Sequence, residues 1–200
     1  YITFSMKRVK KDAKAKLSAV KIRYPEGATF RDLCEKIHGN IKVERSGERT
    51  YADKEFDLFR RIPRPLMVGA QKLLASMDYY NILPGGFIEG DGMYTSIFVA
   101  NLGSVDMDAV YHHLYEWGNC PLFMMVGRIQ ERPVVEDGKV VVRKQLHIRW
   151  SYDERIDDGL SARFGIDSVK HALEPPFEYF GCLADDGSDA RPLDKDAPKA

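Results

Sequence analysis

The sequence lacks the features that define several protein classes. Its longest apolar run, Leu122 to Val126, falls far short of the roughly 20 residues that a membrane-spanning helix needs. The 30 Lys and Arg residues balance 30 Asp and Glu residues, so no overall basic field attracts nucleic acid. With 44% hydrophobic and 11% aromatic residues, the 200-residue chain has the composition of a globular protein rather than of a disordered one. The composition therefore predicts neither a nucleic-acid partner nor a membrane partner.

Cysteine is scarce. Cys34, Cys120 and Cys182 are odd in number and lack metal-ligand spacing, which favours a reducing cytoplasm and no metal centre. Serine-hydrolase, P-loop, dinucleotide and zinc motifs are absent too. We therefore expect a cytoplasmic protein, and any sign of its function must come from several motifs spread along the chain rather than from one short motif.

The first part of the chain predicts a hairpin followed by helices. Residues 1–6 and 17–24 alternate as strands do, and the alternation starts at Tyr1, so we expect the chain to begin inside a fold. Residues 1–28 carry eight basic side chains against two acidic ones, which indicates either a solvated hairpin tip or attraction for a polyanion. Thr29 with Asp32 predicts a capped helix start, and residues 50–82 are typical of further helix that Leu83 to Gly86 closes.

The second part is richer in strands. We expect strands over residues 94–100 and 122–128, a hairpin over 133–142 that turns at Asp137-Gly138, and a strand over 140–152. A helix is expected after Gly159, with Ile166, Val169 and Leu173 on one face. Residues 182–200 are acidic and poor in apolar side chains, which predicts a mobile tail.

Six short motifs in a fixed order carry a family resemblance. They are residues 98–103 (FVANLG), 126–129 (VGRI), 132–138 (RPVVEDG), 151–159 (SYDERIDDG), 162–164 (ARF) and 173–176 (LEPP). Together they closely resemble the catalytic domain of the dihydrolipoyl acyltransferases of 2-oxo acid dehydrogenase complexes. The resemblance is good over about residues 94–176 and weaker over residues 1–45.

The resemblance implies an α/β fold like that of chloramphenicol acetyltransferase, a mixed sheet flanked by helices. It implies one acyltransferase-like domain over residues 1–181 with a helical insertion at about 46–90, and it places the family's first strands and helix upstream of this chain. It further implies a homotrimer or a larger assembly of trimers, with active sites between subunits. The family moves acyl groups between coenzyme A and a thiol or hydroxyl acceptor, so an acyl-CoA or a pantetheine-type thiol is the expected partner.

The resemblance also assigns roles, and two of them fall on altered residues. The family's catalytic histidine, which opens the motif His-x-x-x-Asp-Gly, corresponds to Glu154, and the hydroxyl that holds the oxyanion corresponds to Ala100. Asp158 matches the motif aspartate, whose implied role is structural, paired with an arginine. A free Glu is about 2 pKa units less basic than His, and losing one oxyanion donor costs about 2.7–4 kcal/mol. Together these changes slow the family reaction by about four to five orders of magnitude.

Two interpretations of Glu154 stay open. Burial in an apolar channel would raise the pKa of its carboxyl and make it a better base. Alternatively, Glu154 is an exposed carboxylate paired with Arg155 or another neighbour.

Other residues are candidates for the missing chemistry. His112 and His113 are structural, substrate-facing or metal-binding; on a helix or strand only one of them would face a site. Cys120 is a nucleophile or, by default, a buried inert thiol. Ser96 and Ser104 are candidate hydroxyl donors near the oxyanion, and Asn101, Ser104 and Lys16 are candidate contacts to coenzyme A.

Three functions follow. The chain is a coenzyme A-dependent acyltransferase of weak or altered activity, an inactive oligomeric scaffold, or a protein that binds acyl-CoA or pantetheine without turnover. No swinging-arm lysine motif of a lipoyl domain occurs in this sequence.

Overall fold

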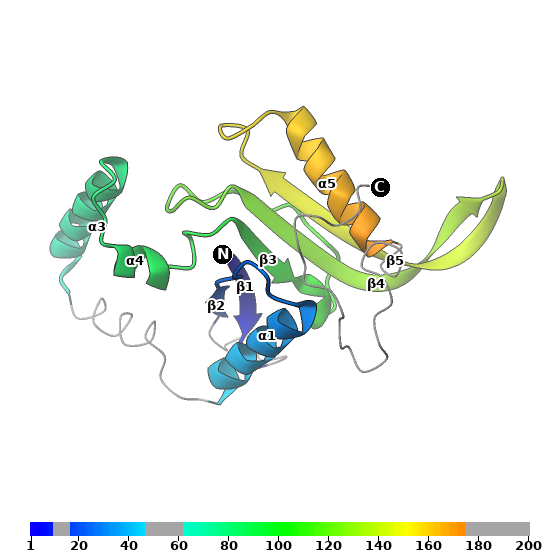
Figure 1. Cartoon of the computed structure of the whole chain (residues 1–200), viewed down its shortest axis with the longest axis horizontal. Helices are drawn as coiled ribbons and strands as arrows, with labels where there is room; N and C mark the ends of the chain where they lie inside the picture. The colour runs from blue at the N-terminus through cyan, green and yellow to red at the C-terminus, as the bar shows by residue number, and fades with distance from the viewer. Residues whose placement is uncertain (10–16, 47–61, 175–200) are drawn as a thin grey trace.

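The computed structural model describes residues 1–9, 17–46 and 62–174 (Figure 1). The hairpin tip with Lys16, the first part of the helical insertion and the acidic tail, on which several predictions fall, lie outside the described residues. The strands are β1 (Ile2–Lys7), β2 (Leu17–Ile22), β3 (Ile97–Asn101), β4 (Leu122–Glu136) and β5 (Lys139–Tyr152). The helices are α1 (Phe30–Arg45), α3 (Arg64–Tyr79), α4 (Gly85–Gly90), α5 (Gly159–Leu173) and the 3₁₀ turn η1 (Leu102–Val105).

The five strands form one mixed sheet in the order β2-β1-β3-β4-β5. β1 pairs in parallel with β3 and β3 with β4, while β2 and β5 lie antiparallel at the two edges. The predicted mixed α/β fold is confirmed. β4 and β5 continue past the sheet as a long hairpin that curves away from the other strands (Figure 1). Its turn is at Asp137 and Gly138, whose φ angles of 50° and 75° are those that an Asp-Gly hairpin turn requires.

Two helices cover one face of the sheet. The space under α1 is lined by Val99 and Val126, and the space under α5 is lined by Ile148 and Trp150. Val126 pairs with Ile148 across β4 and β5, so α1 and α5 lie on the same face.

Local signals set the helix boundaries. The Asp32 amide donates to the Thr29 hydroxyl at 3.2 Å and the Thr29 amide donates to the Asp32 carboxylate at 2.8 Å, which confirms the predicted capping box. Pro65 lies in the first turn of α3, where backbone amides have no acceptor within the helix, so its lack of an N–H costs no hydrogen bond. A short helix, α4, begins at Gly85 directly after Pro84, inside the segment expected to close the insertion.

The tightest packing lies on the other face of the sheet. Phe123 is 1% exposed, and its ring stacks on Phe98 with centroids 4.9 Å apart. Cys120 completes this core cluster, and Met93 and Leu114 pack against it from the loops before β3 and before β4. At the edge of this core the fully buried Thr3 hydroxyl donates to the Gly92 carbonyl at 2.9 Å. The loops that precede β3 and β4 therefore cover this second face.

Gly118 lets the loop before β4 pass close to residue 93. Its φ is +82°, and a Cβ placed there would lie 2.5 Å from the Met93 carbonyl oxygen. We expect Gly118→Ala to destabilise the fold by about 2–4 kcal/mol, because it adds both backbone strain and overpacking. Denaturant unfolding measures this loss. Gly138→Ala is the control, because Gly138 has a similar φ of +75° but open space around it; equal losses in the two variants would contradict the role of the close contact.

In the described ranges no helix is both long and apolar enough to cross a lipid bilayer.

Candidate functional site

Ala100 lies in a row of paired residues that crosses the sheet. The register pairs Ala19 with Ser5, Ser5 with Ala100, Ala100 with Met125, and Met125 with Arg149. Paired residues point to the same face, so the half-buried Ser5 stands directly beside Ala100, which is 8% exposed. Sequence reasoning missed Ser5, because nothing local predicts that β1 pairs with β3.

Asn101 and Ser104 lie on the opposite side of the sheet from the Ala100 side chain. With Val99, they line a cavity of about 470 Å³ between α1 and the sheet. The Ser104 amide donates to the Asn101 side-chain oxygen at 3.2 Å, and the Ser104 hydroxyl donates to the Asn101 carbonyl at 2.7 Å. These contacts hold the turn into η1. Ser96, the other predicted hydroxyl donor, is exposed at the start of β3.

His112 and His113 form the outer end of a column of stacked rings. The column runs from the exposed His113 through His112 and Phe123 to Phe98, with centroid separations of 4.8, 4.8 and 4.9 Å. Tyr115 lies against the edge of the His113 ring. The two histidines lie in an irregular loop rather than on a helix or strand, so the alternation that would let only one of them face a site does not apply. The column places His112 on the same sheet face as Ala100, since Phe123 and Met125 share that face of β4.

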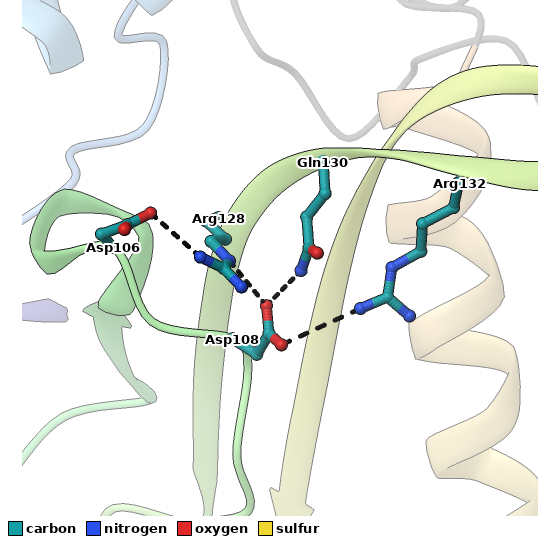
Figure 2. A network of polar contacts seen from close by, with 5 residues as sticks. All are labelled: Asp106, Asp108, Arg128, Gln130 and Arg132. Carbon is teal, nitrogen blue, oxygen red and sulfur yellow. Dashed lines mark hydrogen bonds and ion pairs between the residues drawn. The ribbon is translucent and has the colours of Figure 1, made fainter.

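A polar network fixes the loop that leads to the histidines (Figure 2). Asp108 accepts hydrogen bonds from Gln130 and from the Arg128 guanidinium, the latter at 3.1 Å, and Arg128 also contacts Asp106 at 3.3 Å. Arg132 approaches Asp108 from further along β4, at 3.9 Å. The two carboxylates, Asp106 first, raise the pKa of the Arg128 guanidinium. The loop between η1 and the histidines is therefore tied to β4.

Glu154 is exposed on the turn after β5. Arg155, one of the partners suggested for Glu154, forms a two-pronged contact with Asp153, at 2.6 and 2.8 Å. This contact lowers the pKa of the Asp153 carboxyl. Glu154 lies close to the start of α5, since a Cβ at Gly159 would be 3.6 Å from its Oε1.

Asp158 caps α5. Its carboxylate accepts hydrogen bonds from the amides of Leu160 at 3.0 Å and Ser161 at 2.9 Å, and the Ser161 bond is the main cause of its lowered pKa. The aspartate is therefore structural, as the resemblance implies, but through backbone amides rather than an arginine.

The cap makes a pH-dependent contribution to stability. We expect Asp158→Ala to lower the melting temperature at pH 7 by about 2–4 °C, as loss of one cap does in a chain of this size. Because the folded pKa of Asp158 is lowered, its contribution is present above the unfolded pKa of about 4 and is lost as the pH falls through the folded value. Melting curves of both proteins from pH 3 to 7 measure this, and a gap that stays constant or widens toward pH 3 would contradict it.

Glu154 and Ala100 do not meet within one chain. Ala100 lies level with Arg149 of β5, whereas Tyr152, the last residue of that strand, is three residues and therefore about 10 Å farther along. Glu154 follows beyond that end. Within one copy of the chain the two altered positions therefore lie apart.

Cys120 behaves as the default interpretation predicts. It is 7% exposed, its thiol donates to the Leu122 carbonyl, and burial raises the pKa of the thiol. It is therefore protonated and enclosed at neutral pH, which does not suit a nucleophile. Within the part of the chain that the structure describes, no three His, Cys, Asp or Glu side chains are placed to hold a metal ion.

Comparisons with known proteins agree with the motif order. Residues 91–180 match the family model of the 2-oxoacid dehydrogenases acyltransferase (catalytic domain). The match covers a little under half of the chain and supports the resemblance over these residues. The chain is 45% identical over 60 residues to the lipoamide acyltransferase component of the branched-chain alpha-keto acid dehydrogenase complex of Pseudomonas putida, 29% of this chain and 14% of that protein. It is 49% identical over 47 residues to the dihydrolipoyllysine-residue succinyltransferase component of the 2-oxoglutarate dehydrogenase complex of Cupriavidus necator, 24% of this chain and 11% of that protein.

Solved structures of acyltransferase domains share the fold. The chain superposes on a probable dihydrolipoamide acetyltransferase from Listeria monocytogenes with a TM-score of 0.54 at 18% identity, covering 86% of this chain and 55% of that one. It superposes on the Azotobacter vinelandii dihydrolipoamide acetyltransferase with a TM-score of 0.53 at 15% identity, covering 88% and 54%. That structure comes from a study of the roles of a serine, a histidine and an asparagine in the catalytic mechanism. The chain therefore spans about half the length of these solved acyltransferases.

Proposed function

We propose that this chain is a coenzyme A-dependent acyltransferase of the 2-oxo acid dehydrogenase family whose activity is weak or altered. One observation carries the proposal: the family scaffold is kept around Asn101 and Asp158, while Ala100 and the exposed Glu154 stand at the two positions that hold the family's chemical groups. The asparagine and aspartate both cap backbone amides, so the turns that present the site persist. The groups on those turns have changed.

We propose further that the site lies between subunits of a homotrimer or a larger assembly of trimers. Ala100 lies level with Arg149 of β5, whereas Glu154 follows the end of that strand at Tyr152, so a site that uses both needs a second copy. The long β4–β5 hairpin supports this arrangement, because Ile129, Val135, Val140 and Val142 on it are each at least 66% exposed. A cytoplasmic location fits the three cysteines, which are odd in number.

Two residues on the same sheet face as Ala100 are our candidates to replace the missing groups. The Ser5 hydroxyl stands beside Ala100 in the sheet and is our candidate for the oxyanion donor. His112, on the same face and held by the ring column, is our candidate for a nearby base, with His113 outside it. Lys16 remains a candidate contact for the phosphates of coenzyme A, and Asn101 and Ser104 remain candidates on the opposite face of the sheet.

Coenzyme A binding tests the proposal directly. Titration calorimetry of the chain with coenzyme A and with acetyl-CoA is expected to give saturable heat, since the proposal requires a thioester site. The matched control is dephospho-coenzyme A, which keeps the pantetheine arm and lacks one phosphate. No heat with either coenzyme A or acetyl-CoA would refute the proposed function.

A catalytically inactive oligomeric scaffold is the second candidate. The observation that favours it is that Ala100 is buried while Glu154 points to solvent, so neither is placed as a reactive group in one copy. A trimeric particle without heat from coenzyme A identifies the scaffold. Heat without turnover identifies a protein that holds acyl-CoA or pantetheine without transferring the acyl group.

A further inference from the structure

Helix α3 projects from the body of the domain, and no described part of the chain buries its apolar side. None of its 16 residues is buried, and Leu66 and Leu73 are 65% and 62% exposed. In Figure 1, α3 lies at one end of the molecule, away from the sheet. A helix of this length gains most of its stability from packing, so the exposed apolar side of α3 indicates that another surface binds it.

The apolar residues of α3 follow a heptad pattern. Met67 and Leu74 occupy one heptad position, and Ala70 and Met77 occupy the position three residues later, as in the seam of a two-helix pair. Leu66 and Leu73 extend the seam on one flank. The stripe spans three turns, which suits contact with one other helix.

The other flank of the seam carries Arg64, Gln71 and Asp78, each one heptad apart. Arg64 is at the first helical position and Asp78 is in the last turn. Each charge therefore lies at the end of α3 where the helix dipole disfavours it, because cations are stabilised at the C-terminus and anions at the N-terminus. Within a single helix this arrangement is unfavourable.

An antiparallel copy of the same helix makes these two charges favourable. Residues on one flank pair with the same flank of an antiparallel partner, so Arg64 meets Asp78 of the second copy and Asp78 meets Arg64. Gln71 lies midway between them and faces its own counterpart at the two-fold axis. The same register pairs Met67 with Met77 and Ala70 with Leu74 across the seam. Such an interface is self-complementary and closed.

We propose that α3 is a self-association element, which binds α3 of a second copy of this chain in antiparallel orientation around Gln71. Asp78 is half-buried, and its carboxylate lies near the Tyr94 hydroxyl, whose pKa is raised first by burial and then by its contact with Asp78. A carboxylate accepts several hydrogen bonds, which leaves it able to receive the partner's guanidinium as well. The proposed contact does not use Glu154, Ala100 or any residue of the candidate acyltransferase site.

Charge reversal on the full chain tests this proposal by sedimentation equilibrium. The wild type is expected to show a concentration-dependent doubling of mass. Either single variant, Arg64→Asp or Asp78→Arg, places two like charges opposite each other at both ends of the interface. We expect it to lower the association constant at least tenfold. The double variant Arg64→Asp/Asp78→Arg restores opposite charges and is expected to restore it. Each substitution also suits the helix dipole, so the loss in the single variants does not come from a weaker helix.

Lys72→Asp is the matched control, since it makes the same charge change on the far side of α3 and is expected to leave the doubling intact. Leu73→Asp is expected to abolish it, and α3 has no buried residue whose loss would unfold the domain. A wild type that never doubles, or a double variant that is not restored, overturns the proposal. Flotation with anionic phospholipid vesicles that depends on Leu73 but not on Arg64 also overturns it, in favour of a lipid surface. Coenzyme A calorimetry on the same variants is expected to be unchanged, so failure here is distinct from failure of the proposed function.

Discussion

The double variant Ala100→Ser/Glu154→His is expected to transfer acyl groups from acyl-CoA about 10⁴–10⁵ times faster than the wild type. The histidine restores a base about 2 pKa units stronger than a free carboxylate, and it titrates near neutral pH, where a general base works best. The serine restores one oxyanion donor, worth about 2.7–4 kcal/mol of transition-state stabilisation. Release of free coenzyme A thiol with a dithiol acceptor measures the rate.

Both new side chains must fit the surroundings of positions 100 and 154. Residue 154 lies on an exposed turn between a strand end and the capped start of α5, so an imidazole meets no packed core there. Residue 100 needs room for one added oxygen beside Ser5. The single variants are the controls, each expected to recover part of the gain, and Glu154→Gln is the matched change that adds no base. A double variant no faster than the wild type would show that the family positions no longer form a site in this chain.

Truncation of Phe123 is expected to cost about 3–5 kcal/mol of unfolding free energy, as loss of a buried aromatic ring typically does. Phe123 is 1% exposed and joins the core ring of Phe98 to the loop ring of His112. Phe123→Ala therefore opens a cavity and releases the loop that carries both histidines. Urea unfolding measures the loss.

Met124→Ala provides the control for Phe123→Ala. Met124 is the next residue on β4 but faces the other side of the sheet and is only half-buried. Its loss is expected to be clearly smaller. Equal losses in the two variants, or a loss below about 1 kcal/mol for Phe123→Ala, would contradict the assignment of the core to the Phe98–Phe123 face.

The parts of the fold that sequence predicts are those set by neighbours along the chain. The Thr29–Asp32 capping box begins α1, the Asp137-Gly138 pair turns the hairpin, and alternation identifies β1, β2 and β5. Each of these depends on backbone hydrogen bonds or side-chain periodicity within a few residues. The six ordered motifs predicted the overall fold, because their order and spacing resemble those of a family whose fold is known.

The parts that sequence reasoning missed depend on long-range pairing or on irregular backbone. Ser5 lies beside Ala100 only because β1 inserts between β2 and β3, a register that no local pattern specifies. His112 and His113 stack on one another because their loop has neither helical nor extended periodicity, so the alternation argument did not apply. Arg155 contacts Asp153 rather than Glu154, because a separation of two residues on this turn allows both prongs of the guanidinium to reach one carboxylate.

The rate of acyl transfer by the unaltered chain, measured beside Glu154→Ala, tests the central claim most directly. Acetyl-, propionyl- and longer acyl-CoA are offered with a dithiol acceptor, and thiol release is followed. We expect slow transfer from at least one of these thioesters, and we expect Glu154→Ala to slow it further. No transfer from any thioester, with no difference between the wild type and Glu154→Ala, would contradict the assignment of an acyltransferase activity to this chain.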